Sequence, residues 1–426
     1  MPRIRQHLVT LAVMTALGAW AGAGPGAAAA QTADDLFRPD VLHEVRLQVH
    51  SRDWALLQAR YLENTYYPCE LTWNGLRIPD VAIRSRGNAT RSGVKPGLRA
   101  DFNRYTPGRR VFGQASLVLD NLLQDPSMLR EALATRVYAR LGFPVARQSF
   151  ARLYVNDRYH GLYAIVEAVE EPFLDRVYGE SDGYLFEYHW LDYWYFTYPG
   201  PALQPYIEMF EPRTHTDQSP ETLAGPIEDL VRVVNETEDD RFEAEMGGLL
   251  PLDEMLAQVA IDRLLTNIDW LVGGWGVNNL YLYRSTQTGR WRFIPWDLDV
   301  SMQWTDLPVT ADLEANVLTR RAFTIPWLRD HYFTTLAAAA DSLAEPVQAS
   351  AESDATLTWL EAQVEQAYAL VRDAALEDGL KPYSNEDFEA SVAFLRHFAK
   401  ERPWFVRCEA ARALDPETIG LYCAGR

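Results

Sequence analysis

The sequence has little cysteine and no cluster of zinc-type ligands. Only three cysteines occur in 426 residues, which excludes a small scaffold held together by disulfides. No group of histidines and cysteines has zinc-site spacing, and His189 and His215 stand alone, as ordinary polar histidines do. In an oxidising compartment Cys408 and Cys423 are natural partners that would close a short C-terminal loop. Cys69 is then left as a buried free thiol or as a partner for another chain.

Positive charge and long apolar runs are also scarce. Lys and Arg number 40 against 59 Asp and Glu, a net charge of −19, which argues against a nucleic-acid-binding protein. Residues 1–30 are different, with Arg3, Arg5, an apolar run over 8–20 and small residues at 28–30. This pattern predicts a cleaved signal peptide rather than a membrane anchor, and its removal would change the net charge to −21. Because no later apolar run is long enough to span a bilayer, we expect a secreted or periplasmic protein with no membrane span.

The remaining composition, 48% hydrophobic with 12% aromatic residues, is that of a globular protein. Alternating patterns and turn signals predict a strand-rich first half and a mostly helical second half. This order favours an α+β protein of two lobes with a cleft between them. The expected strands are 43–49, 67–73, 76–84, 97–105, 115–119, 150–155, 161–166, 279–284 and 291–296, and the expected helices are 53–61, 125–141, 252–268, 355–375 and 385–400.

A basic turn that contains glycine is the first candidate for chemistry. Arg84, Arg86, Gly87 and Asn88 begin a stretch that runs to Arg110 and holds eight basic residues and one acid. Guanidinium groups, together with small residues that let backbone N–H groups approach, suit an anion such as phosphate. A solvated basic face, or pairing with the acidic remainder of the chain, would explain the same charges.

Glu131 is the second candidate. It lies one turn into the predicted 125–141 helix, and it follows a segment that carries Lys95. A carboxylate in this place can hold that lysine as an ion pair. The simpler explanation is an acid that stabilises the positive end of a helix dipole.

The third candidate is a set of oxygen ligands in the second half. Asp269 follows a predicted helix, Asn278 and Asn279 precede a strand, and Asp297 and Asp299 follow the next strand. Carboxylates and a carboxamide suit Mg²⁺, which keeps waters and substrate phosphates as its other ligands. A further carboxylate can accept a proton from a nucleophile. An isolated Asp-x-Asp can also simply cap a turn.

The order of these parts resembles that of protein-kinase-like folds, and the chain resembles in particular the spore coat protein H (CotH) kinase family over about residues 40–305. The motifs that carry the resemblance are Ile83-Arg84-Ser85-Arg86-Gly87-Asn88, Lys95, Leu129-Arg130-Glu131, Leu153-Tyr154-Val155-Asn156, Gly161-Leu162-Tyr163, Val166-Glu167, Gly183-Tyr184-Leu185-Phe186, Asn279-Leu280-Tyr281-Leu282-Tyr283 and Ile294-Pro295-Trp296-Asp297-Leu298-Asp299.

The resemblance implies a secreted, atypical protein kinase that uses ATP and Mg²⁺ to phosphorylate Ser or Thr of an exported or envelope protein. It implies one kinase-like domain over 31–426, with an N-lobe at about 40–166 and a C-lobe at about 167–426. The implied roles are phosphate binding by Arg84, Arg86, Gly87 and Asn88; binding of the α- and β-phosphates by Lys95, paired with Glu131; a hinge against adenine in the strand that ends at Glu167; a base at Asp269; and Mg²⁺ ligation by Asn279 and Asp297, with Asn278 and Asp299 as alternatives.

Two other functions compete with the kinase. One is a non-catalytic binding or structural protein of the envelope or surface on a kinase-like fold. Its candidate site is an aromatic insert that could stack on a sugar or a peptide, or simply pack in the core. The other is a metal-dependent phosphohydrolase, which would use the acidic cluster without a paired Lys95. The insert holds Trp190, Tyr193, Trp194, Tyr195 and Tyr198.

Overall fold

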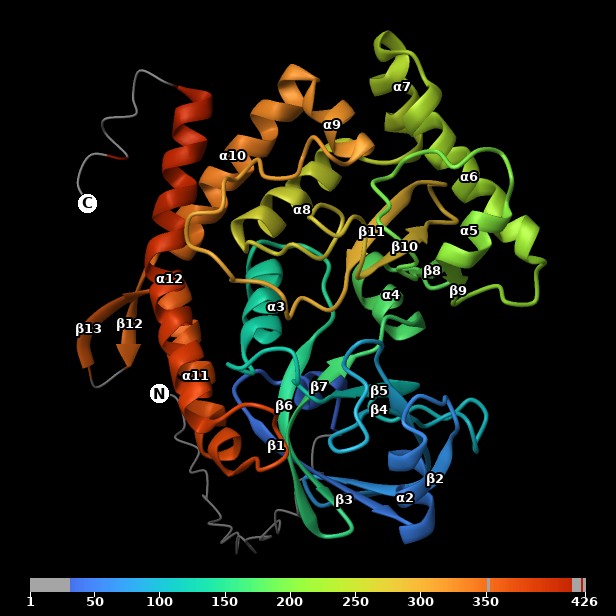
Figure 1. The fold of residues 1–426 in the computed structure, drawn as a ribbon, viewed down its shortest axis with the longest axis vertical. Coiled ribbons are helices and arrows are strands. Elements are labelled where there is room, and N and C mark those ends of the chain that lie inside the picture. Colours follow the sequence, from blue (N-terminus) through green and yellow to red (C-terminus); the bar gives the residue numbers. More distant parts are fainter. Residues whose placement is uncertain (1–30, 351–352, 416–422, 424–426) are drawn as a thin grey trace, which may run out of the picture.

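The strands of the first half of the chain close into a barrel. The computed structural model describes residues 31–350, 353–415 and 423, and Figure 1 shows the barrel at its lower end. The order around the barrel is β1-β2-β3-β4-β5-β7-β6, and β1 and β6 form its parallel pair. The strands are β1 (Leu42–Val49), β2 (Tyr67–Trp73), β3 (Leu76–Arg86), β4 (Gly97–Asp101), β5 (Ser116–Asp120), β6 (Gln148–Val155) and β7 (Arg158–Glu167), and the helices of this part are α1 (Ala33–Leu36), α2 (Ser51–Ala59) and α3 (Arg130–Arg140).

Alternation in the sequence explains the barrel. Val45, Leu47 and Val49 of β1 are buried at every second position, and they join one continuous core inside the barrel. Asn74 and Gly75 both have positive φ, 44° and 85°, in the two-residue turn that joins β2 to β3. That geometry is the tight hairpin that an Asn-Gly pair predicts, so this expectation is confirmed.

The second half surrounds a smaller sheet of order β11-β10-β8-β9 with helices, on the opposite side of the molecule from most of the barrel (Figure 1). Its hydrophobic core continues onto α3 and one face of the barrel. The chain is therefore α+β, as predicted. The elements are α4 (Glu171–Tyr178), β8 (Tyr184–Tyr188), α5 (Gln204–Met209), β9 (Phe210–Pro212), α6 (Pro220–Glu236), α7 (Asp239–Leu249), α8 (Leu252–Leu264), β10 (Leu280–Arg284), β11 (Trp291–Pro295), α9 (Val317–Phe323) and α10 (Pro326–Leu343).

The chain ends in two long helices that return to the barrel. After the hairpin β12 (Pro346–Ser350) and β13 (Ser353–Thr358), α11 (Trp359–Glu377) packs on β7, and α12 (Asn385–Leu414) runs back beside α10. Cys408 forms a disulfide with Cys423 and Cys69 is a buried free thiol, as expected. No helix within the described residues is long and apolar enough to cross a membrane. The predicted signal peptide, 1–30, lies outside the described residues.

Several helix boundaries differ from the predicted ones, and two of them lie near candidate site residues. The helices predicted at 53–61, 355–375 and 385–400 span Ser51–Ala59, Trp359–Glu377 and Asn385–Leu414. The helix predicted from 125 begins at Arg130, because Met128 has a φ of 58° and the Asp125 carboxylate accepts from the backbone N–H groups of Leu129 and Arg130. The helix predicted to 268 ends at Leu264, since Thr266 has a φ of 52°. Residues 265–269 therefore form a loop, and Asp269 lies beyond the helix rather than at its end.

Candidate functional site

A cleft with a volume of about 1220 Å³ lies between the barrel and the smaller sheet. The basic turn after β3 lines one side of it, and the start of β10 and the end of β11 line the other. The structure therefore brings together parts of the first and third candidate groups, which lie almost 200 residues apart in the sequence. Seven of the predicted site residues line the cleft: Arg84, Arg86, Gly87, Asn88, Asn278, Asn279 and Asp297.

Asp269, Asn278 and Asn279 form one hydrogen-bonded group. Asn278 Nδ2 donates to Asp269 Oδ1 at 2.8 Å, and Asn279 Nδ2 donates to Asp269 Oδ2 at 2.9 Å. Asp269 is 5% exposed and is not itself among the residues that line the cleft. Burial raises the pKa of its carboxyl above the ordinary value, although both amides lower it. Both asparagines thus point their amide nitrogens at the same carboxylate. Within the described part of the chain their amide oxygens accept no hydrogen bond and remain able to bind a cation.

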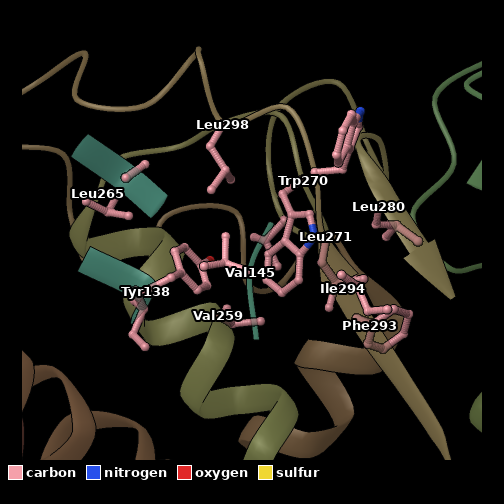
Figure 2. Close-up of a cluster of buried hydrophobic side chains, with 14 of the residues drawn as sticks. Tyr138, Val145, Val259, Leu265, Trp270, Leu271, Leu280, Phe293, Ile294 and Leu298 are labelled. Atoms are coloured by element: carbon pink, nitrogen blue, oxygen red, sulfur yellow. The ribbon is translucent and has the colours of Figure 1, made fainter. Parts of the chain in front are cut away.

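The neighbours of these polar residues anchor them in the core. Trp270 and Leu271 follow Asp269 and are buried between α8 and the β10–β11 hairpin, and Leu298 follows Asp297 (Figure 2). Asn279 and Asp297 have φ values of 43° and 55°. This left-handed conformation costs some free energy at a non-glycine residue, less at Asn and Asp than at others, and the surrounding packing maintains it. Rigid packing therefore fixes the direction of both polar side chains.

Six carboxylates lie close enough in this region to interact electrostatically: Asp120, Asp125, Glu131, Asp269, Asp297 and Asp299. Burial and then the charge of Asp120 raise the pKa of Asp297 to about 7. Burial and then Asp297 raise the pKa of Glu131 well above its ordinary value, and burial and Asp297 do the same for Asp299. Arg86 acts in the opposite direction on both Asp297 and Glu131. A cation bound here would relieve the repulsion.

The oxygen donors fit a magnesium ion that also binds a substrate. Among the described residues, no three Asp, Glu, His or Cys side chains converge in a ready-made metal site. Mg²⁺ commonly needs only one or two carboxylates when substrate phosphates supply further ligands. Asp297, with the amide oxygen of Asn279 or Asn278, offers that kind of partial site at the cleft. Asp299 does not line the cleft, and its Oδ1 is buried without a hydrogen-bond partner.

Lys95 does not pair with Glu131, contrary to the expected ion pair. Its Nζ donates to Asp378 Oδ2 at 2.7 Å and to the Leu162 backbone oxygen at 2.9 Å, and the lysine side chain is fully buried. Lys95 precedes β4, and its side chain enters the end of the barrel that faces the α11–α12 turn. Lys95 and Glu131 are both absent from the cleft lining. Glu131 instead accepts from Gln148 Nε2 at 3.3 Å.

Arg86 is the basic residue that lies beside Glu131 and Asp297. It lines the cleft, and its guanidinium carbon lies 5.0 Å from the centre of the Trp296 ring. Among the described residues, Arg84, Arg86 and Arg91 have no carboxylate within ion-pair distance. Burial and the charges of Arg84 and Arg86 lower the pKa of Arg91. This group of unpaired cations around Gly87 provides the positive charge that an anion site requires.

Most other basic residues that line the cleft are neutralised by acids. Arg99 pairs with Glu170, and Arg110 Nη2 lies 2.6 Å from Glu171 Oε2. Arg213 pairs with Glu187. Arg109 also lines the cleft without a carboxylate partner among the described residues, and its Nη1 donates to the Pro79 backbone oxygen at 2.5 Å. The other three unpaired arginines, Arg84, Arg86 and Arg91, are grouped around Gly87.

Glu167 is part of the framework, which corrects its expected place at a nucleotide-binding hinge. Its carboxylate is fully buried and accepts from Arg147 Nη2 at 2.7 Å and from Arg176 Nη2 at 2.5 Å. With both oxygens taken, the side chain has no role at the cleft. The chain that follows it, from Ala168 to Glu170, does line the cleft.

The aromatic insert between β8 and α5 supports the loop that follows Asp269. Trp194 is buried, and its backbone oxygen accepts from Val277 N at 2.7 Å. Trp190 Nε1 donates to the Trp275 oxygen and Tyr195 Oη to the Gly274 oxygen, both at 3.0 Å. The insert is therefore largely a packing element.

Two charged residues that the sequence patterns did not single out also support the site. Arg402 of α12 is fully buried and donates to the backbone oxygens of Arg263 and Leu264 at the end of α8. It also donates to Leu307, beyond Asp299. Asp378 holds Lys95. Both lie in the helical end of the chain, where no motif or spacing pointed to them.

Comparisons with known proteins identify the family of this chain. The model of a family described as "CotH kinase protein" matches residues 83–406. The inner spore coat protein H of Bacillus subtilis (strain 168) is 25% identical to this chain over 374 residues, which cover 85% of this chain and 96% of the relative. The match to the family model begins in β3, the strand that precedes the basic turn, and extends through α8, the β10–β11 hairpin and most of α12. The chain therefore belongs to the CotH kinase family.

Proposed function

We propose that this protein is an exported protein kinase that transfers the γ-phosphate of ATP to Ser or Thr of another protein, with Mg²⁺. The observation that carries the proposal is the shared cleft: the unpaired arginines around Gly87 line it together with Asp297, Asn278 and Asn279, and both asparagines donate to Asp269, which lies behind the lining. Phosphoryl transfer depends on positioning and charge neutralisation, and these groups supply both. In this proposal the barrel, up to Glu167, acts as the N-lobe, and the remainder acts as the C-lobe of a kinase-like fold.

Arg86, with Arg84 and Arg91, takes the phosphate-binding part that the family resemblance implied for Lys95. A guanidinium binds two phosphate oxygens at once and stays charged. Gly87 has a φ of 112°, and a Cβ there would lie 2.9 Å from Thr90 Oγ1. The bare backbone at Gly87 thus lets the turn close over the phosphates.

Asp297 and Asn279 would hold Mg²⁺, with Asn278 as the alternative amide. Held by these residues, the ion would supply charge neutralisation for the phosphoryl group during transfer. Asp297 faces the cleft and Asp299 does not, which favours Asp297 as the principal carboxylate.

Asp269 would accept the proton of the acceptor hydroxyl. In the transfer, the Ser or Thr oxygen bonds to the γ-phosphorus, the bond to ADP breaks, and the hydroxyl proton passes to the Asp269 carboxylate. The raised pKa of Asp269 favours this step over that of an ordinary aspartate. The amides of Asn278 and Asn279 hold the carboxylate in one orientation, and each oxygen keeps a lone pair for the hydroxyl.

Export and a location on the cell surface or in the envelope form the rest of the proposal. The predicted signal peptide supports it, and so does the spore coat assignment of the 25% identical relative.

The test measures transfer of ³²P from ATP to a casein-type Ser/Thr acceptor and to extracellular proteins from the cells that make this chain. Wild type is compared with Asp269→Asn. We expect Mg²⁺-dependent transfer by wild type, and loss of transfer with retained nucleotide binding in the variant. Nucleotide binding without transfer to any acceptor, or no binding at all, would favour a non-catalytic binding protein. Release of inorganic phosphate alone would favour a phosphohydrolase.

A further inference from the structure

A buried charge pair joins the barrel to the turn between α11 and α12. Lys95 and Asp378 are both fully buried and lie 283 residues apart in the sequence. Asp378 Oδ2 accepts from Lys95 Nζ and from Leu162 N at 3.0 Å, while Oδ1 accepts from the backbone N–H groups of Leu380 and Lys381 at 3.0 and 3.2 Å. Every strong acceptor site of this carboxylate therefore has a donor.

The barrel is shaped to admit this carboxylate. Gly161 of β7 has a φ of 120°, and a Cβ at that position would lie 2.5 Å from Asp378 Oδ2. Any other residue would collide with the carboxylate as well as being strained. The close approach of Asp378 thus depends on glycine in the opposing strand.

On its other side, Lys95 ends the loop that carries Gly87 and Arg91 and that directly follows Arg86, the last residue of β3. Asn121 Nδ2 donates to the backbone oxygens of Thr90 and Lys95 at 3.0 and 2.9 Å, and Ser92 Oγ accepts from Lys95 N at 3.1 Å. Arg91 Nε donates to the Gly87 oxygen at 2.7 Å. The loop between β3 and β4, residues 87–96, is therefore tied from Gly87 to Lys95.

We propose that Asp378 is a positioning residue: by holding Lys95, it fixes the 87–96 loop in the conformation that binds the nucleotide phosphates. This inference rests on the proposed function, because the loop's ligand is the nucleotide. A loop that is already ordered loses less conformational entropy when the ligand binds, and its affinity is correspondingly higher. The C-terminal helices, which carry no recognised motif, thereby contribute to the site from outside the cleft.

Other contacts attach the end of α11, next to this turn, to the barrel without reaching the loop. Tyr159 Oη donates to the Ala374 oxygen at 2.8 Å, and Glu377 pairs with Arg152. Attachment alone does not require a buried lysine, because well-packed apolar residues commonly replace a buried ion pair without loss of stability. The feature that distinguishes Lys95–Asp378 from these contacts is its connection to the loop.

The experiment compares Asp378→Asn with Tyr159→Phe, a control that removes a hydrogen bond between the same two parts of the molecule. Hydrogen exchange is measured without nucleotide, and steady-state kinetics are measured with ATP varied. For Asp378→Asn we expect faster exchange in 87–95 and a KM for ATP raised roughly tenfold, with kcat within about twofold of wild type. Tyr159→Phe should lower the melting temperature without changing either readout.

Lys95→Met/Asp378→Asn provides the same test without a lone buried charge, in case the single variant does not fold. It should fold and show the same exchange pattern and raised KM. Unchanged exchange in 87–95 and an unchanged KM in a folded variant would overturn the inference. A wild-type protein that binds no nucleotide would overturn the proposed function, whereas the exchange result would still show whether Asp378 orders the loop.

Discussion

Two basic residues nine positions apart, Arg86 and Lys95, lie in opposite electrostatic situations. At the end of the barrel, Lys95 is buried and fully paired. In the cleft, Arg86 has acids nearby but no ion-pair partner among the described residues, and two further unpaired arginines lie next to it. A paired buried charge contributes to the framework, whereas unpaired charges grouped at an opening are available to attract a ligand of opposite charge. Charge pairing in the structure therefore distinguishes Lys95, a framework residue, from Arg86, a candidate binding residue. The sequence motif treats both residues as parts of one nucleotide site.

The largest effect is expected for Asp297→Asn. Mg²⁺-dependent transfer should fall on the order of a hundredfold or more, because the variant lacks the carboxylate that we propose as the principal Mg²⁺ ligand. The apo protein should become more stable at pH 8. A carboxyl whose pKa is raised to about 7 in the folded state destabilises that state increasingly as the pH rises from about 4 to 7, and asparagine removes the penalty. Thermal unfolding with and without Mg²⁺-ATP measures both effects.

Asparagine also adopts the left-handed backbone of position 297 readily. A loss of apo stability at pH 8 would therefore indicate that the Asp297 charge is paired in the folded protein. The cleft would then hold a paired structural charge, as the Lys95 end of the barrel does, and the contrast between the two places would disappear.

Arg86→Ala should weaken Mg²⁺-ATP binding by roughly 10- to 100-fold, the range for loss of a charge-assisted hydrogen bond to phosphate. Arg77→Ala is the matched control, because Arg77 lies on the same strand, β3, pairs with Glu70 and stands outside the cleft. Calorimetric titration gives both affinities. Equal affinities in the two variants would show that unpaired charge does not mark the nucleotide site.

A smaller effect is expected at His160, which lies at the Lys95 end of the barrel. Burial, followed by the Lys95 charge, lowers the pKa of His160 to about 4, although Asp378 opposes this. As the pH falls, the unfolded state therefore binds a proton at His160 before the folded state does. The free energy of unfolding decreases as the pH falls from about 6.5 towards 4, by up to about 1.4 kcal/mol per pH unit. His160→Gln should reduce this slope in urea titrations. An unchanged slope would show that His160 is not held neutral in the folded protein.

The smallest effect is expected for Tyr193→Ser. Tyr193 is 59% exposed and lies in the aromatic insert. Its removal should leave Mg²⁺-ATP affinity unchanged and change stability by less than about 0.5 kcal/mol. Loss of binding to envelope material without any change in nucleotide binding would instead assign the main function to the insert.

Local patterns predicted much of the fold. Alternation in β1 and the Asn74–Gly75 turn identified barrel strands, because burial every second residue is a property of the strand itself. The closure of the barrel through a parallel β1–β6 pair was not predicted, since no local pattern encodes which strands meet.

Most residues of the candidate site were predicted from the sequence, but the ion-pair partners of the charged residues near it were not. The motif order placed Arg86, Asn279 and Asp297 in one site, and all three line the cleft. The partner of Lys95 could not be predicted, because Asp378 reaches it only through the packing of α11 and α12. Glu167 was misplaced for a related reason: Arg147 and Arg176 neutralise it from either side in sequence, and nothing in their spacing shows that they converge.

The most direct test is calorimetric titration of Mg²⁺-ATP into the mature wild-type chain at pH 8, repeated without Mg²⁺. The account predicts saturable binding to one site per chain that requires the metal. Absence of binding at millimolar ATP, or equal binding without Mg²⁺, would contradict the assignment of the arginine-lined cleft as a nucleotide site.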